Sequence, residues 1–141
     1  MHTSDLADGG EVEGNIAHNF RLNGRPPPLH VTHTWGAGWP RGLRRYRYVI
    51  ASDILLYVSA YPALVQTLWE LFAPAGAAGR GKEAEAVAEA EAAAAADVRC
   101  EEFVMVWNRR MDASKAFFEL MQQRGFACSH HGQCVYSFSL A

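Results

Sequence analysis

The chain has 141 residues, half of them hydrophobic, and a formal net charge of -2 at pH 7. This length suits one domain with a sizeable core, and the near-neutral charge gives no electrostatic footprint for nucleic acid. The longest mostly apolar stretch, residues 54–65, is too short to span a bilayer. We therefore expect neither nucleic acid nor a membrane as a partner.

Cysteine usage indicates a reducing compartment. Cys100, Cys128 and Cys134 are odd in number and lack the spacing of a disulfide framework. The first ten residues are polar and acidic, unlike a secretory signal or a basic transit peptide. We expect a cytoplasmic protein, with the nucleus as a further compartment.

The first element that the pattern predicts is an amphipathic helix over residues 11–23. Val12, Ile16 and Phe20 recur at a spacing of four residues, which places them on one helical face. Gly24 follows in a position where a glycine commonly ends a helix. Three consecutive prolines then favour extended backbone.

Two strands are predicted next, over residues 29–35 and 48–57, with a glycine-containing loop over residues 36–40. In the second strand the apolar run Val49–Ala51 meets Ser52–Asp53 before apolar residues resume. Near-continuous apolar runs are typical of strands buried on both faces of a parallel sheet. A carboxylate fits such a run only near the carboxyl end of the strand, where ligands bind in open α/β sheets. This segment therefore predicts both a fold and a site.

A second helix is predicted directly after this strand. Ser59 can cap it, Pro62 suits its first turn, and Pro74 ends it. Its buried stripe consists of Leu64, Val65, Leu68 and Phe72. Residues 76–97 differ in composition, because alanine, glutamate and glycine dominate and Val87 alone is a larger aliphatic residue. We expect this segment to be an exposed low-complexity insertion.

The last third of the chain predicts a strand, a helix and a hairpin. Residues 103–107 are an apolar run, and Asp112 or Ser114 can cap a helix after it. Residues 127–131 and 134–140 predict an antiparallel hairpin. The alternation of strands and helices indicates a doubly wound α/β sheet that this hairpin completes.

Three groups of residues in this order of elements carry a resemblance to a known family. They are Thr3-Ser4-Asp5 with the evenly spaced Asn15, Asn19 and Asn23, then Thr34-Trp35-Gly36, then Ala51-Ser52-Asp53 through Tyr57. With these motifs the chain resembles the seven-stranded S-adenosylmethionine-dependent methyltransferases. Within them it is similar to the lysine-methyltransferase-like group that includes the calmodulin-lysine enzyme. The match covers all of the chain except the insertion.

The resemblance implies S-adenosylmethionine as the cofactor and a protein as the methyl acceptor. Asp5 would hold the ribose hydroxyls, because a carboxylate accepts two hydrogen bonds in a fixed fork. Trp35 would pack on the adenine ring, as an aromatic face suits a purine. Ala51 and Ser52 would line the methionine side, where small residues leave room.

The resemblance also implies two residues on the acceptor side. Asp53 and Tyr57 would face the methyl-acceptor channel and form the catalytic pair. Many members have an aromatic residue three positions after the acidic one, where this chain has Leu56. Thr34 likewise replaces the usual aspartate before the tryptophan.

In the resembled fold a first strand, a glycine-rich loop and a first helix would precede Asp5. The expectation is therefore a Rossmann-like methyltransferase sheet that is truncated at its amino end, with residues 1–141 as a partial domain. The absent strand would lie between the strand that ends at Asp5 and the strand over residues 48–57. The competing interpretation is a non-catalytic α/β module that binds a partner.

Two other residue groups have a functional and a structural interpretation. Cys128, His130, His131 and Cys134 are zinc-ligand types, but no second pair with finger-like spacing exists, so we expect no metal. Arginines and tyrosines alternate over residues 41–48, a pattern that also occurs on nucleic-acid-binding surfaces. Because the net charge of the chain is negative, we expect a solvated loop over these residues.

Overall fold

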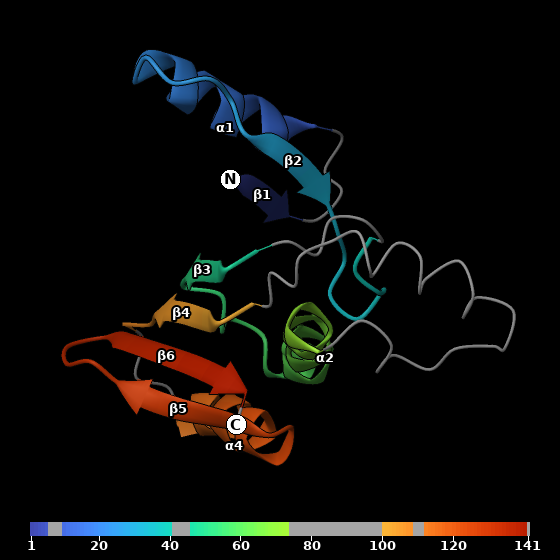
Figure 1. Ribbon diagram of the computed structural model, residues 1–141, viewed down its shortest axis with the longest axis vertical. Helices are drawn as coiled ribbons and strands as arrows, with labels where there is room; N and C mark the ends of the chain where they lie inside the picture. The colour runs from blue at the N-terminus through green and yellow to red at the C-terminus, as the bar shows by residue number, and fades with distance from the viewer. Residues whose placement is uncertain (6–9, 41–45, 74–99, 109–111, 141) are drawn as a thin grey trace, which may run out of the picture.

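The computed structural model describes residues 1–5, 10–40, 46–73, 100–108 and 112–140. These residues form a mixed α/β fold with three α-helices and with six strands in two sheets (Figure 1). The α/β class expected from the sequence is confirmed at this level. The expected insertion over residues 76–97 lies outside the described residues.

The smaller sheet belongs to an N-terminal unit that comprises β1 (His2–Asp5), α1 (Glu11–Leu22) and β2 (Leu29–Thr32). β1 and β2 pair in parallel through this single crossover. Gly24, at φ +64°, follows the end of α1, as expected for a glycine that ends a helix. The apolar stripe of α1 is only half-buried, and no residue of this helix is fully buried.

The larger sheet has the strand order β3 (Tyr48–Ser52), β4 (Glu102–Val106), β6 (Val135–Leu140), β5 (Phe126–His130). β3 and β4 are parallel, and β6 runs antiparallel to both of its neighbours. The predicted C-terminal hairpin is therefore confirmed, with β6 inserted between β4 and β5.

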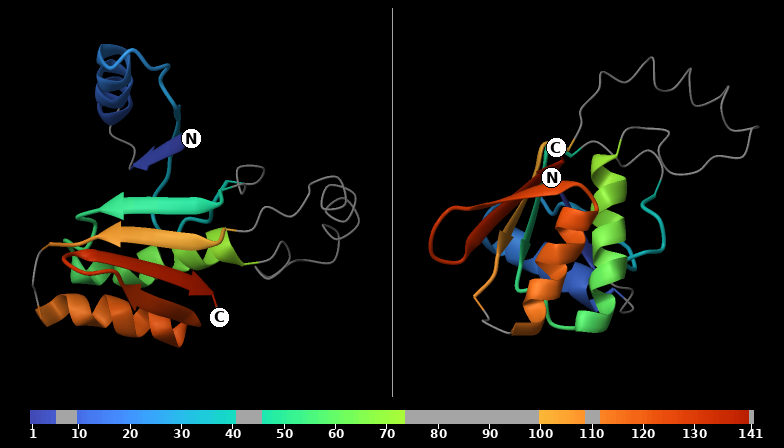
Figure 2. Two further views of the ribbon diagram at one scale, coloured as in Figure 1. Left: turned by 60° about the vertical axis from the view of Figure 1, so that its left-hand side comes forward. Right: turned by 90° about the horizontal axis from the view of Figure 1, so that it is seen from below.

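Two helices, α2 (Tyr61–Phe72) and α4 (Lys115–Gln123), cover one face of the larger sheet (Figure 2). Short 3-10 turns, Val58–Ala60 and Asp112–Ser114, lead into them. The core lies between these helices and the sheet, and its fully buried side chains are Leu55, Tyr61, Phe103, Met105, Phe117, Met121 and Phe138. The expected apolar stripe of α2 is confirmed. We call this sheet with its two helices the main body.

The strands predicted over residues 29–35 and 48–57 are both longer than the observed strands. β3 ends at Ser52, not at Tyr57, because Asp53 adopts φ +52° and turns the chain out of the extended conformation. β2 ends at Thr32, not at Trp35, because its last ladder partner is Asp5, the final residue of β1.

The expectation that β3 is buried on both faces is wrong. Ile50 is 76% exposed and Tyr48 is 50% exposed, whereas Val49 and Ala51 pack against the core. The reason is that α2 and α4 cover only the face to which Val49 and Ala51 point. The expected caps also differ: Ser59 lies inside a 3-10 turn, and Ser114 makes no side-chain cap hydrogen bond at α4.

The two sheets are separate within the described part of the chain. β1 pairs only with β2, and β3 pairs only with β4, so no ladder joins β1 to β3. A side-chain hydrogen bond of 2.6 Å joins His2 Nδ1 to the Tyr46 hydroxyl across this break.

Candidate functional site

Three of the predicted site residues lie at or directly after the carboxyl ends of strands. Asp5 ends β1, Ser52 ends β3, and Asp53 follows β3 directly. In the left view of Figure 2 the arrowheads of β1, β3 and β4 point to the same side of the molecule. In open α/β sheets ligands bind at this edge.

Asp53 is held by its backbone, while its side chain is exposed. Its N–H donates to the carbonyl of Val106, with an N···O distance of 3.1 Å, and its φ of +52° lies in the left-handed region. Such a conformation is costly for a residue with a side chain and persists only where neighbours fix it. The sharp turn at Asp53 therefore leaves its carboxylate at the edge of the sheet, next to the exposed Ser52 and the half-buried Ala51.

Tyr57 lies further along the segment that leaves Asp53. Leu55 is fully buried, and its carbonyl accepts a hydrogen bond of 3.1 Å from the Tyr61 hydroxyl. Tyr57 itself is 72% exposed, so the described residues do not enclose it. Its role at an acceptor channel stays a prediction.

The loop after β2 positions Trp35 through two hydrogen bonds to α2. The Gly36 N–H donates to Thr67 Oγ1 at 2.9 Å, and the Trp39 N–H donates to the buried Glu70 Oε2 at 2.9 Å. A Cβ on Gly36 would lie 3.2 Å from the Ala63 Cβ, a tight contact, and the φ of +82° also favours glycine here. Trp35 is consequently half-buried against the core of the main body.

Asp5 is connected to the same loop from the other side. Its carbonyl accepts a hydrogen bond of 2.9 Å from the His33 N–H, two residues before Trp35. The fold thus links Asp5 and Trp35 through the pairing of β1 with β2. It places Ala51, Ser52 and Asp53 on the far side of the break between the sheets.

A row of four aromatic rings crosses this break, and sequence reasoning assigned it no role. Ring centroids are 5.3 Å apart for His2 and Tyr46, 5.9 Å for Tyr46 and Trp39, and 4.8 Å for Trp39 and His33. Burial raises the pKa of the Tyr46 hydroxyl. Within the described part of the chain, the buried atoms His33 Nε2 and Trp39 Nε1 have no hydrogen-bond partner. Buried polar atoms are normally paired, so both require an explanation.

Glu70 is a further residue that sequence reasoning missed. Its Oε2 accepts the bond from the Trp39 N–H, and its Oε1 accepts a hydrogen bond of 2.8 Å from Gln66 Nε2. The available signal was an acidic residue between Trp69 and Leu71 in a helix that is otherwise largely apolar. A carboxylate in that position needs buried donors.

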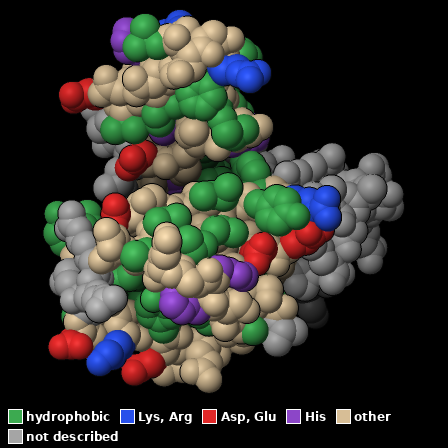
Figure 3. Space-filling model, turned by 90° about the vertical axis from the view of Figure 1, so that its left-hand side faces the viewer, with side chains coloured by type: hydrophobic (Ala, Val, Ile, Leu, Met, Phe, Trp, Pro, Cys, Tyr) green, Lys and Arg blue, Asp and Glu red, His purple; other side chains and the backbone are tan. Residues whose placement is uncertain are grey.

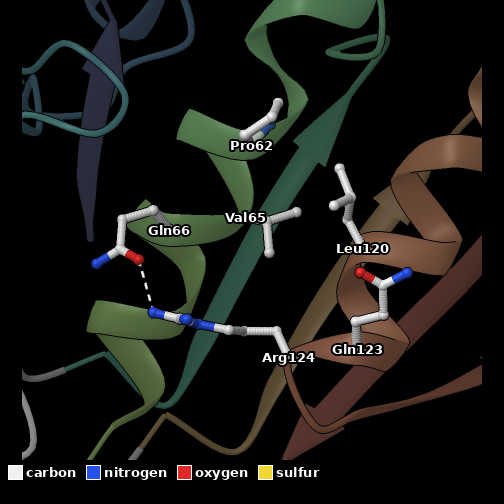
Figure 4. A pocket seen from close by; sticks show the side chains of 6 residues that line it. All are labelled: Pro62, Val65, Gln66, Leu120, Gln123 and Arg124. Carbon is white, nitrogen blue, oxygen red and sulfur yellow. Dashed lines mark hydrogen bonds between the residues drawn. The ribbon is translucent and has the colours of Figure 1, made fainter.

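Two shallow hollows lie on the helical side of the main body. One of about 300 Å³, between α2 and α4, is lined by Pro62, Val65, Gln66, Leu120, Gln123 and Arg124 (Figure 4). The Arg124 guanidinium donates to Gln66 Oε1 at 2.7 Å and lies 4.4 Å from the Trp69 ring centroid. The other, of about 310 Å³, lies between α4 and β5. Neither hollow includes a predicted site residue.

The histidines and cysteines of the hairpin make local contacts. His131 Nε2 lies 2.7 Å from Ser137 Oγ, His130 stacks on Tyr136 with ring centroids 4.6 Å apart, and Cys134 Sγ donates to an oxygen of Asn108. Among the residues that the structure describes, no three or more His, Cys, Asp or Glu side chains are grouped to hold a metal ion. Similarly, none of the helices formed by those residues has the length and apolarity to cross a membrane.

The three cysteines are free thiols in different environments. Cys100 is buried, Cys134 is half-buried and Cys128 is exposed. Burial raises the pKa of the Cys100 thiol to about 12. Because the thiolate is the reactive form, this environment disfavours reaction at Cys100.

No protein-family model matches the chain, and no curated protein matches it in sequence.

Proposed function

We propose that this chain is an S-adenosylmethionine-dependent methyltransferase-like protein of the group that methylates protein lysines, and that it acts in the cytoplasm. The arrangement of the two sheets carries the proposal. In the resembled fold one further strand lies between the strand that ends at Asp5 and the strand that ends at Ser52. This position corresponds to the break between β1 and β3. On the other side of β3 and β4, the antiparallel β6 continues the larger sheet.

The chemistry of the strand-end residues fits this cofactor. Asp5 presents an exposed carboxylate suited to ribose hydroxyls, and Ala51 and Ser52 are small enough to admit a methionine chain. Trp35 offers an aromatic face from the loop that Thr67 fixes on α2. When bound, S-adenosylmethionine would supply an electrophilic methyl group.

Asp53 is the proposed catalytic residue. Methyl transfer to an amine needs a neutral nitrogen and alignment more than it needs a strong acid or base. The exposed Asp53 carboxylate would accept a hydrogen bond from the substrate amine and orient its lone pair. Tyr57 would shape the approach of the acceptor side chain.

Calorimetric titration with S-adenosylmethionine tests the proposal. The chain should bind it weakly or not at all, because its residues supply only ribose, adenine and part of the methionine contacts. An extended chain, with a strand, a glycine-rich loop and a helix ahead of Met1, should bind it. In that extended chain Asp5→Ala or Trp35→Ala should weaken binding, and Asp112→Ala is the matched exposed control. Failure of the extended chain to bind would overturn the proposal.

Asp53→Ala separates the catalytic role from cofactor binding. We expect this variant of the extended chain to bind the cofactor normally and to transfer methyl groups more slowly to lysine-containing protein. Equal loss of binding and transfer would place Asp53 on the cofactor side instead.

The second candidate function is a non-catalytic module that binds a partner. Two observations favour it: Tyr57 is 72% exposed, and neither hollow of the main body contains a predicted site residue. It becomes the better interpretation if the extended chain does not bind the cofactor.

A further inference from the structure

One face of α2 contacts the loop after β2. Ala63, Thr67 and Glu70 recur at positions i, i+4 and i+7, a spacing that places them on the same face of a helix. Thr67 accepts the hydrogen bond from the Gly36 N–H, and Glu70 accepts the one from the Trp39 N–H. Thr67 and Glu70 are both buried. The position of the loop therefore depends on the polar groups of this face.

Glu70 depends in turn on its hydrogen-bond donors, because a buried carboxylate is costly without them. Its Oε2 binds the Trp39 N–H, and its Oε1 binds Gln66 Nε2. Gln66 lies four residues before Glu70, so the two side chains are neighbours on the helix. One donor at each oxygen fixes the rotation of the carboxylate, and this rotation keeps Oε2 directed at the loop.

The amide of Gln66 is oriented by Arg124. The Arg124 guanidinium donates to Gln66 Oε1 at 2.7 Å, while Gln66 Nε2 donates to Glu70. A guanidinium offers donors only and a carboxylate offers acceptors only. One orientation of the Gln66 amide therefore satisfies both neighbours, and Arg124 selects it.

The end of α4 places Arg124 beside α2. The Arg124 N–H donates to the Leu120 carbonyl at 3.0 Å, and Gly125, at φ +91°, turns the chain out of the helix. The guanidinium lies 4.4 Å from the Trp69 ring centroid, a cation–π contact that restricts its position. Figure 4 shows Arg124 reaching from the end of α4 across to Gln66 on α2.

The other end of this series of hydrogen bonds reaches the predicted cofactor residues. The Trp39 and His33 rings are 4.8 Å apart, so the loop closes on itself around Trp35. The His33 N–H binds the carbonyl of Asp5. Figure 3 shows the N-terminal unit as a lobe above the main body, and this loop is the described part of the chain that leads from one to the other.

We propose that Arg124, Gln66 and Glu70 form a hydrogen-bond relay that positions the loop carrying Trp35. Arg124 and Gln66 are then positioning residues, since they act through Glu70 and the Trp39 backbone rather than on the cofactor. The proposal deepens the proposed function and rests on it for the role of Trp35 as the adenine contact. It assigns the end of α4 a part in the alignment of Trp35 and Asp5.

Hydrogen exchange of single amides in the full chain, followed by NMR, tests the relay. Arg124→Met removes the donor and keeps an apolar side chain beside Trp69, so exchange at the Trp39 amide should speed up by about threefold. Gln66→Leu removes the donor to Glu70 itself and should speed it up by about tenfold. The Trp107 amide, which binds the Cys134 carbonyl elsewhere in the main body, should not change. Unchanged exchange at Trp39, or equal acceleration at Trp107, would overturn the proposal.

A double variant shows whether Arg124 acts through Gln66. In the Gln66→Leu background, Arg124→Met should have no further effect at Trp39, whereas additive effects would refute the relay. Gln123→Met, in the same hollow, is the matched control and should leave exchange at Trp39 unchanged. Failure of the extended chain to bind S-adenosylmethionine would overturn the proposed function alone, because exchange at Trp39 is measured without cofactor.

Discussion

The N-terminal unit and the main body have similar kinds of secondary structure but very different cores. The main body buries Phe103, Met105, Phe117 and Met121 completely, while Val31 is the one buried apolar residue within β1, α1 and β2. Isolated helices of about 12 residues, the length of α1, are marginal in water. The difference teaches that regular secondary structure needs a core: the N-terminal unit depends on its neighbours, and the main body supplies its own.

The strongest test of this comparison replaces one phenylalanine in each region. Phe103→Ala should lower the free energy of unfolding by about 3–5 kcal/mol, because it opens a cavity in a close-packed core. Phe20→Ala, on the half-buried side of α1, should cost less than about 1 kcal/mol. Urea unfolding followed by circular dichroism measures both. Equal losses would show that the two regions share one core.

The connection between the two regions is tested at Glu70. Glu70→Ala leaves the buried Trp39 N–H without its acceptor, and such a loss costs about 1–3 kcal/mol. Glu119→Ala, at an exposed position of α4, should change stability by less than about 0.5 kcal/mol. Thermal unfolding compares the two variants. A silent Glu70→Ala would mean that the loop after β2 is not anchored on α2.

Two glycines in the loop after β2 test how closely this loop packs against α2. Gly36 and Gly38 both have φ near +80°, but only Gly36 has a neighbour, Ala63, within reach of a Cβ. Each substitution by alanine should cost about 1 kcal/mol for the left-handed backbone. Gly36→Ala should cost about 1 kcal/mol more, since its methyl group meets α2. If chemical denaturation finds the two variants equal, the loop is not seated against this helix.

The smallest effect is expected at Asp53, where the main body meets the break between the sheets. Asp53→Gly should raise the free energy of unfolding by about 0.5 kcal/mol, because glycine accepts the left-handed conformation without strain. Gln133→Gly, with φ +49° in the hairpin, is the matched control and should behave alike. A destabilised Asp53→Gly protein would reveal a structural role for the carboxylate, in addition to its proposed catalytic one.

The helices were predictable from the sequence to within one or two residues. Their apolar spacing and the flanking glycine and proline residues are local signals that the final packing preserves. The lengths of β2 and β3 were not predictable, because a strand ends where its ladder partner ends or where one residue adopts a positive φ. The apolar residues 54–56 and Trp35 therefore looked like continuations of β3 and β2, because apolar character reveals neither the end of a ladder partner nor a positive φ.

Only the positions of three candidate site residues at strand ends could be predicted from the sequence. Asp5, Ser52 and Asp53 do lie at strand ends, since a polar residue after an apolar run marks such an end. The ring row and Glu70 could not be predicted, because they join residues far apart in the sequence. The uncovered face of β3 could not be predicted either, since its apolar run looks the same whether one face or both are covered.

The tryptophans of this chain provide an optical consequence of the same division. Trp39 is buried in the ring row, and Trp107 is buried at the end of β4. Indole fluorescence shifts to longer wavelength when water reaches the ring. A variant that retains only Trp39 would therefore report the opening of the ring row by a shift of its emission maximum. A variant that retains only Trp107 would report the opening of the sheet in the same way.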